Sequence, residues 1–343
     1  MLALRKTKAS FGLELHEVSD PAPVGPGEVR VQVEAVGICG SDVHAYEWTD
    51  GYDFMVPHLP VTMGHEFAGR VVATGPGAAI AVGTKVSVYP RVWAGDGQTA
   101  WPGDPRLRGP RGALGLTLDG GFARFLNVPA GNALPLPENL DTELGALVEP
   151  LAVASEAVLV GEVGLGDTVL VLGPGTIGQG LALMARAAGA ARVIISGRAD
   201  GPRFAVLNQL GFTDIVDVAE GPLKDQVLAL NNGRPADVVL EATGHPPSIT
   251  EALGVLKYEG VLVVVGIHPA PLTLPLTTFV RNRHQLRASH GSEPPTWEKV
   301  IAVMSGNPEG FRPMITHRLP LDRGLEGFEL SRQRAASKVI LNP

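Results

Sequence analysis

A glycine-rich turn between an apolar run and a helical pattern constrains the fold of this chain more than any other feature. The turn reads GPGTIG, closes the apolar run Asp167–Gly173 and opens a helix-like stretch, IGQGLALMARAAGA. In that setting the first glycine permits a tight turn, the second lets the backbone approach a pyrophosphate, and the third allows close helix–strand packing. The helix N-terminus adds unpaired N–H groups. The turn therefore predicts a dinucleotide site at Gly173, Gly175, Thr176 and Gly178.

Further apolar runs follow this turn with a regular rhythm. They read ARVIIS, ADVVLEAT and GVLVVVGI, and each interval leaves room for one crossover helix. Such a rhythm is typical of a parallel sheet covered by helices on both faces. The chain before the turn reads instead as short strands, with VRVQVEAVG (29–37), FAGRVVATGPG (67–77) and GTKVSVYP (83–90) as the clearest. After about Gly291 the character is mixed again, with a helix-like WEKVIAVMSG and a final strand SKVILN.

Length and composition favour a globular enzyme of two domains. The chain has 343 residues, which exceeds the size at which one core usually keeps growing, and its 45% of hydrophobic residues argues against disorder. A net charge of -7 makes nucleic acid an unexpected partner. The longest apolar runs, such as Val261–Ile267, are far shorter than the ~20 residues of a membrane helix, and the N-terminus lacks a signal-peptide pattern. We therefore expect no membrane association. The single cysteine suits a reducing compartment, so we expect a cytoplasmic location.

The end of the strand ARVIIS is expected to lie beside the adenosine ribose of the dinucleotide. NAD sites usually place an Asp or Glu there, about 20 residues after the glycines. This chain offers Ser196, Gly197 and Arg198 instead, with Arg203 shortly after. No carboxylate would repel a 2′-phosphate, and two guanidiniums can pair with one. The pattern favours NADP over NAD; the alternative is that both arginines are solvated loop residues.

A second group of residues has the chemistry of a metal site. Cys39 lies in GICGSDVH, and His65 and Glu66 lie in MGHEFAG. A thiolate, an imidazole and a carboxylate are ligands that zinc accepts, and a catalytic zinc takes three protein ligands with one open position. A lone Cys is more often a buried small hydrophobe, however, and a lone His is more often structural. Residue types and spacing alone leave both interpretations open.

Five motifs in order cover nearly the whole chain: GICGSDVH, GHEFAGRVVATG, VEPLAVASEA, GPGTIG and the closing ITHRLPL…KVILNP. Together they resemble the zinc-containing medium-chain dehydrogenases, in the branch that holds sorbitol and L-threonine dehydrogenases. The resemblance implies an α/β chain with a GroES-like, β-rich catalytic domain (1–153 and 291–343) and a Rossmann domain with a doubly wound parallel sheet (154–290). It also implies NAD(P)-dependent oxidation of a small alcohol by a homo-oligomer, either a dimer or a tetramer.

The resemblance also implies roles for residues at the metal. Cys39, His65 and Glu66 would ligate zinc. Glu149, in the EPLAV stretch, would be a fourth ligand or would hold the metal-bound water. The alternative for Glu149 is a helix N-terminal carboxylate that the helix dipole favours.

Two more residues match the proton relay of the family. A metal that lowers the pKa of an alcohol leaves a proton that must reach solvent. Ser41 supplies a hydroxyl beside the metal, and His44 supplies an imidazole that can pass the proton on. Further positions fall where relatives contact the coenzyme: Ile177, Arg203, Val265, Gly266, Ile267, Ser289, His290 and Gly291.

The chain departs from the family in its metal content. Many relatives hold a second, structural zinc with four cysteines in the lobe after the GHE motif. Here that lobe is Arg91–Leu118, and the single cysteine of the chain rules out a four-cysteine site. We therefore expect one catalytic zinc, no structural zinc, and a lobe held by packing alone. Glu156 is a second departure, since relatives usually have His there.

The substrate is open between two classes. The stretches DVHAYEW and LRASHG…TW resemble threonine dehydrogenases. Ser41, where threonine dehydrogenases usually have Thr, and Glu149 resemble polyol dehydrogenases instead. Because those two positions lie at the metal, a small polyol or sugar-like diol is favoured, with L-threonine as the alternative.

A rival of another class is a catalytically silent, dinucleotide-binding protein with the same fold. The retained Cys39, His65, Glu66 and Ser41 count against it, because a binding module has no need of them. A third interpretation, a zinc-free quinone or enoyl reductase of the same superfamily, is disfavoured by the same four residues.

Overall fold

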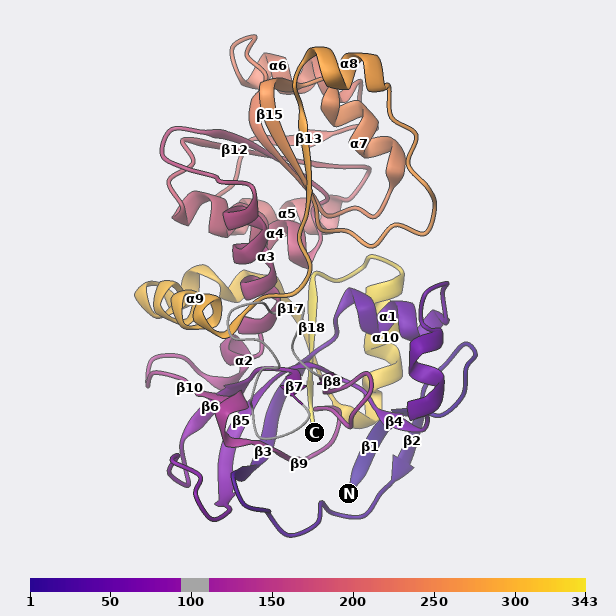
Figure 1. Cartoon of the computed structure of the whole chain (residues 1–343), viewed down its shortest axis with the longest axis vertical. Helices are drawn as coiled ribbons and strands as arrows, with labels where there is room; N and C mark the ends of the chain where they lie inside the picture. The colour runs from indigo at the N-terminus through magenta and orange to yellow at the C-terminus, as the bar shows by residue number, and fades with distance from the viewer. Residues whose placement is uncertain (94–110) are drawn as a thin grey trace. The chain divides into compact units, whose positions relative to one another are not determined.

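The structure is a computed structural model of the 343-residue chain, and it describes residues 1–93 and 111–343 (Figure 1). The chain forms two compact units. The first comprises residues 1–149, 315–333 and 338–343, and the second comprises residues 150–314 and 334–337. The first unit is thus assembled from both ends of the sequence. Most of the lobe expected at Arg91–Leu118 lies outside the described residues, so its packing stays a prediction.

The first unit is built on a seven-stranded sheet in the order β10-β6-β5-β3-β18-β17, with β9 also paired to β3. Its longest strand, β3, alternates half-buried and buried residues up to Ala35, as its period-two pattern predicts. The strands expected at 29–37, 67–77 and 83–90 are confirmed as β3, β5 and β6. The strands of this sheet are β3 (Glu28–Gly37), β5 (Glu66–Thr74), β6 (Lys85–Val88), β9 (Phe125–Pro129), β10 (Ala133–Pro135), β17 (Ile315–Pro320) and β18 (Lys338–Asn342).

Smaller elements complete the first unit. A three-stranded sheet has the order β2-β1-β4, and β7 pairs with β8 in a separate hairpin-like ribbon. These strands are β1 (Leu2–Lys6), β2 (Glu14–Glu17), β4 (Val61–Thr62), β7 (Arg91–Trp93) and β8 (Arg111–Ala113). The helices are α1 (Gly40–Glu47), α2 (Thr142–Gly145) and α10 (Gly324–Arg332), with short 3-10 turns η1 (Asp53–His58), η3 (Ala130–Asn132) and η6 (Leu321–Arg323). α3 (Val148–Val160) begins at the end of this unit and continues into the second.

The second unit is a six-stranded parallel sheet in the order β13-β12-β11-β14-β15-β16 (Figure 1). The chain runs outward from β11 to one edge and then from β14 to the other, so the strand order reverses between β11 and β14. Dinucleotides bind across the carboxyl ends of the strands at such a point. The strands are β11 (Thr168–Leu172), β12 (Arg192–Gly197), β13 (Ile215–Asp217), β14 (Ala236–Glu241), β15 (Leu256–Val264) and β16 (Gln285–Ala288).

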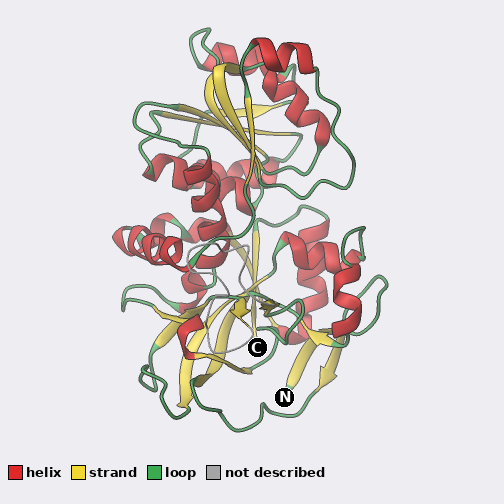
Figure 2. Cartoon of the chain, in the orientation of Figure 1, coloured by secondary structure: helices red, strands yellow, loops and turns green. Residues whose placement is uncertain are grey.

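Helices cover this sheet on both faces (Figure 2). One face packs Leu170, Ile194 and Val239 against Leu223 of α6 and Ile249 of α7 in a single buried cluster. The intervening strand residues point to the opposite face, because side chains alternate along a strand. The apolar runs are buried throughout, as a sheet covered on both sides requires. The helices are α4 (Thr176–Ala187), α5 (Gly201–Gln209), α6 (Leu223–Leu230), α7 (Pro246–Leu253), α8 (Leu276–Arg281) and α9 (Pro294–Gly306), with η4 (Pro308–Gly310) and η5 (Arg312–Met314).

The compact units differ from the expected domain boundaries at residues 150–153, 291–314 and 334–337, all of which lie in the second unit. The contact between α9 and α3 explains why. Thr296 Oγ1 donates a hydrogen bond to Glu156 Oε2 at 2.8 Å, and Trp297 is fully buried. Glu156 therefore anchors α9 to α3. None of the helices in the described part of the chain has the length and apolar character needed to cross a bilayer.

Candidate metal and coenzyme sites

Cys39 occupies the turn between β3 and α1. Its backbone is extended at the N-cap position, and its N–H donates to Asp42 Oδ2 at 3.0 Å. An acidic side chain in the first turn suits a helix N-terminus, since it accepts from an unpaired N–H group and faces the positive end of the dipole. Asp42 is fully buried. The motif CGSD thus fixes Cys39 at the end of the sheet.

The predicted metal ligands converge. One donor atom from each of Cys39, His65 and Glu66 lies within 4.8 Å of the others. His65 and Glu66 are buried at the start of β5, and Glu66 Oε1 has no hydrogen-bond partner. An unpartnered buried carboxylate oxygen is costly unless a cation or donor faces it. The three residues therefore fit a divalent ion with sulfur, nitrogen and oxygen ligands.

Asp42 also orients His65. Its Oδ1 lies 3.3 Å from His65 Nδ1, which leaves Nε2 as the nitrogen for a metal. Burial by itself would lower the pKa of His65, but the charges of Asp42 and Cys39 outweigh it and raise the pKa well above its usual value. Burial and the charge of Glu66 raise the pKa of the Cys39 thiol. A carboxylate on the second nitrogen of a ligating histidine is the common support of such sites.

Lys338 is a functional residue that the sequence analysis missed. Its Nζ forms a fully buried ion pair with Glu66 Oε2 and donates to Ile38 O at 2.9 Å. Burial would lower the pKa of Lys338, but the charges of Glu66 and Cys39 raise it. A Cβ on Gly37 would lie 2.3 Å from Glu66 Oε2, so this close packing needs glycine there. The only sequence signal was a lysine inside the apolar final strand.

Glu149 is not one of the converging donors, but the charges of His65 and Glu66 act on its carboxyl group. Burial raises the pKa of Glu149 to about 7, with His65 lowering it and Glu66 raising it. The described residues bring only Cys39, His65 and Glu66 within ligand distance of one another. Glu149 as a fourth ligand or a water holder therefore stays a proposal.

The two predicted relay residues lie on α1. Ser41 Oγ is 3.4 Å from His65 Nε2, and His44 Nδ1 is 3.3 Å from Thr49 Oγ1. Among the described residues no hydrogen bond joins Ser41 to His44. Tyr52, which the sequence analysis did not single out, is buried with its ring stacked on that of His44 at 6.2 Å. Burial, then the charges of Cys39 and Asp42, raise the pKa of Tyr52, so its phenol stays protonated near the ligands.

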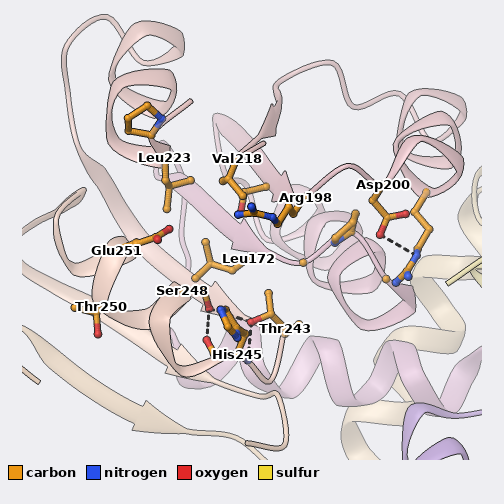
Figure 3. A pocket seen from close by; sticks show the side chains of 18 of the residues that line it. Leu172, Arg198, Asp200, Val218, Leu223, Thr243, His245, Ser248, Thr250 and Glu251 are labelled. Carbon is orange, nitrogen blue, oxygen red and sulfur yellow. Dashed lines mark hydrogen bonds and ion pairs between the residues drawn. The ribbon is translucent and has the colours of Figure 1, made fainter. Parts of the chain in front are cut away.

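The glycine turn in the second unit lines a cleft of about 990 Å³ (Figure 3). Gly173 adopts φ of 104°, and a Cβ on Gly178 would lie 1.7 Å from Gly173 O. Both glycines are therefore required by the backbone itself. Figure 3 shows Thr250 and Glu251 at one end of the cleft and Asp200 at the other. The cleft lies at the carboxyl ends of β11, β12 and β14, where a dinucleotide is expected.

The cations expected at the adenosine end line this cleft. Arg198 and Arg203 do so together with Lys224 and Arg334, which the sequence analysis missed. Arg203 Nε is 3.2 Å from Asp200 Oδ2, and its Nη2 is buried without a hydrogen-bond partner. Burial lowers the pKa of Arg203; Asp200 opposes this shift, while Arg334 adds to it. The lining residues predicted from sequence are Gly173, Gly175, Ser196, Arg198 and Arg203.

Other predicted coenzyme contacts lie outside this cleft. Thr176 Oγ1 donates to Ser337 O at 2.9 Å, and Ile267 is 51% exposed. Ser289 is buried and its N–H donates to Val264 O at 3.0 Å, which ties it to β15. Contacts at the following positions therefore stay proposals: Thr176, Ile177, Gly178, Val265, Gly266, Ile267, Ser289, His290 and Gly291.

Comparison with known proteins gives a consistent answer. Residues 25–138 match the family described as alcohol dehydrogenase GroES-like domain, and residues 176–306 match that described as zinc-binding dehydrogenase. The chain is 32% identical over 346 residues to an L-threonine 3-dehydrogenase of Mesorhizobium japonicum, covering 100% of this chain and 98% of the relative.

Solved structures agree with the sequence comparison. The fold matches 2R,3R-butanediol dehydrogenase from Bacillus subtilis with a TM-score of 0.87 and 29% identity, covering 100% of this chain and 99% of the other. It also matches a Sinorhizobium meliloti 1021 protein bound to NADP with a TM-score of 0.84 and 27% identity, with the same coverage of 100% and 99%. The chain therefore belongs to the zinc-containing medium-chain dehydrogenases, in the branch of the L-threonine and sorbitol dehydrogenases, and is a zinc-dependent, NAD(P)-dependent alcohol dehydrogenase.

Proposed function

We propose that Cys39, His65 and Glu66 hold one zinc ion per chain at the site where a secondary alcohol is oxidised. The convergence of three donor atoms within 4.8 Å, together with an unpartnered buried oxygen on Glu66, carries this proposal. Bound there, zinc supplies the Lewis acidity that lowers the pKa of a substrate hydroxyl. Asp42 holds the His65 ring in place, and Lys338 fixes one oxygen of Glu66, so the donors are positioned in advance.

The substrate we propose is a small neutral polyol or vicinal diol. The surroundings of His65 are rich in carboxyl groups. The charge of Asp42 acts on His65, those of His65, Glu66 and Asp42 act on Glu149, and Lys338 is already paired with Glu66. A substrate carboxylate would need a free cation to replace its hydration. Apart from the zinc ion, which the substrate hydroxyl would bind, the cations that the electrostatics place at these ligands are His65, itself a proposed ligand, and the paired Lys338. A neutral hydroxylated substrate suits them better.

L-threonine remains the second candidate. The observation that favours it is the 32% identity to an L-threonine 3-dehydrogenase over the whole chain. A panel of polyols, vicinal diols, sugars and L-threonine, assayed by absorbance of the reduced coenzyme, separates the two. We expect the highest kcat/KM with a diol or polyol. A higher kcat/KM with L-threonine would overturn the polyol assignment, and no turnover of any alcohol would overturn the catalytic one.

We further propose that the coenzyme is NADP. Gly197 ends β12 where a ribose-binding carboxylate usually stands, and Arg198 follows it at the edge of the cleft. Asp200, the carboxylate at that end, is already engaged by Arg203. Arg203 Nη1 lies 3.1 Å from where a Cβ of Gly175 would be, so this guanidinium faces the glycine turn and suits either coenzyme. Arg198 is therefore the residue that would discriminate.

Arg198→Ala is expected to narrow the preference for NADP+ over NAD+ by about tenfold, the loss of one charge-assisted hydrogen bond. Titration of each coenzyme measures it. Arg192→Ala is the matched control: Arg192 begins the same strand at its opposite end, where it pairs with Asp214 at 3.3 Å. It should leave the preference unchanged. The proposal would be wrong if NAD+ bound as tightly as NADP+ or more tightly and Arg198→Ala changed neither affinity. Arg198 would then be a solvent-exposed loop residue without a role in coenzyme choice.

Self-association, a dimer or tetramer, is also proposed. β16 is an edge strand with mostly exposed residues, and Leu276 and Val280 of α8 are 64% and 69% exposed. An unprotected sheet edge and exposed apolar side chains each suit pairing with another chain. A monomer in sedimentation velocity would overturn this. We also propose a reducing location such as the cytoplasm, because the one cysteine must stay reduced for its thiolate to ligate metal.

A further inference from the structure

Glu241 is a fully buried carboxylate at the last position of β14. Its Oε1 accepts hydrogen bonds from Thr243 N at 2.6 Å, Thr243 Oγ1 at 2.6 Å and Gly244 N at 2.9 Å. Each of these partners donates, which suits the acceptor-only, ionised form of the carboxylate. The Glu241 side chain therefore binds the first residues of the loop after β14 through these three hydrogen bonds.

His268 completes the shell of this carboxylate. Its Nε2 lies 2.8 Å from Glu241 Oε2, and the His268 side chain is 15% exposed. An ionised carboxylate only accepts, so the contact requires a proton on Nε2 that is donated to Glu241. His268 belongs to the loop after β15, and it is the ionisable partner that the structure gives to the Glu241 charge. A charge buried to this degree is tolerated only when it is paired and hydrogen-bonded.

The two loops also touch through their backbones. Glu241 O accepts from Val265 N at 2.9 Å and from Gly266 N at 3.1 Å. A Cβ on Gly266 would lie 2.5 Å from Gly244 N and 2.9 Å from Glu241 Oε2. Side chain and backbone of Glu241 together hold the loop after β14 against the loop after β15.

The two loops lie at the carboxyl ends of neighbouring strands, where the coenzyme is expected. Thr243 and His245, in the loop after β14, line the coenzyme cleft, with Thr243 beside Gly173 of the glycine turn. β15 is the next strand of the sheet, on the side away from β11 and β12. A dinucleotide whose adenosine end lies over β12 extends across the carboxyl ends toward β14 and β15. Both loops therefore border the path of one coenzyme molecule.

We propose that Glu241 and His268 form a positioning pair for the coenzyme. The pair locks the two loops together before the coenzyme binds, so that binding does not have to order them. Removing the His268 N–H leaves one oxygen of a buried carboxylate unpaired. Glu241 can then regain a partner only by turning away, which releases the N–H groups of Thr243 and Gly244. This proposal rests on the use of NAD(P) by the family and not on the proposed substrate.

The test compares coenzyme binding in His268→Leu and His268→Gln. We expect the Kd of NADPH and of NADH to rise about tenfold or more in His268→Leu, since one hydrogen bond to a charged group is lost. His268→Gln keeps an N–H donor for Glu241 and should recover most of the affinity. Turnover at saturating coenzyme should change little in both variants, because neither residue touches the reacting atoms.

Lys257→Met is the matched control. Lys257 pairs with Asp237 at 2.7 Å between the same two strands, β14 and β15, but at their amino ends. It should lower Tm without changing either Kd. Glu241→Gln is a second route if His268→Leu does not fold, because it removes the buried charge and should also raise both Kd values.

Three outcomes would overturn the proposal: unchanged Kd values in His268→Leu or Glu241→Gln, a rise of the same size in Lys257→Met, or His268→Gln no better than His268→Leu. Since the measurement is coenzyme binding and needs no substrate, a failure of the polyol assignment leaves it unaffected.

Discussion

Replacing Cys39 by alanine is expected to remove bound zinc and to lower kcat/KM by at least about 10³-fold, because a catalytic metal contributes several kcal/mol of charge stabilisation. Cys39 supplies the only thiol of the chain, and its donor atom lies within 4.8 Å of those of His65 and Glu66. Without it, two donors remain for an ion that takes three protein ligands in a catalytic site. Zinc should then dissociate during dialysis.

Elemental analysis and steady-state kinetics on the same protein sample measure both effects. Val43→Ala, a substitution in the same helix outside the converging donors, should retain zinc and activity. The unmodified chain should carry one zinc, and two per chain would contradict the proposal of a single site. Full metal content and activity in Cys39→Ala would show that the ligands lie elsewhere.

The parallel sheet could be predicted because its signals are local. Each buried strand appears as one apolar run, and the glycine turn Gly173–Gly178 marks where the first strand meets its helix. Cys39, His65 and Glu66 could be found for a related reason, since their residue types suit zinc before any geometry is known. Identifying their surroundings needs the folded chain.

Contacts between distant residues could not be predicted. Lys338 pairs with Glu66 across 272 residues of sequence, because β18 enters the sheet beside β3 while β5 lies on its other side. Arg334 reaches the coenzyme cleft from residues 334–337, which join the second unit although their neighbours in sequence belong to the first. Glu241 ends β14 and His268 lies in the loop after β15, and neither residue type marks a pair. Only the sheet order brings each of these side chains to its partner.

Ser41→Ala is expected to lower kcat by about 10² to 10⁴-fold, the usual contribution of a positioned acid–base group. Ser41 Oγ lies 3.4 Å from His65 Nε2, so the hydroxyl sits beside the proposed ligands. His44 follows three residues later on α1, and residues at that spacing share one face of a helix. No described hydrogen bond joins the two side chains, so a further group must carry the proton between them. His44→Ala should therefore cost less than Ser41→Ala, since water can take the place of the outer imidazole.

Metal content separates a relay defect from a damaged site. Ser41→Ala should keep its zinc while kcat falls, because Ser41 is not one of the three converging donors. Ser41→Thr preserves the hydroxyl and should restore most of the turnover, whereas Ser41→Cys, with a weaker hydrogen-bond donor, should not. His44→Ala should also keep its zinc, because His44 is not one of the three converging donors either. Turnover equal to the unmodified enzyme in Ser41→Ala at every pH would mean that the proton leaves by another path.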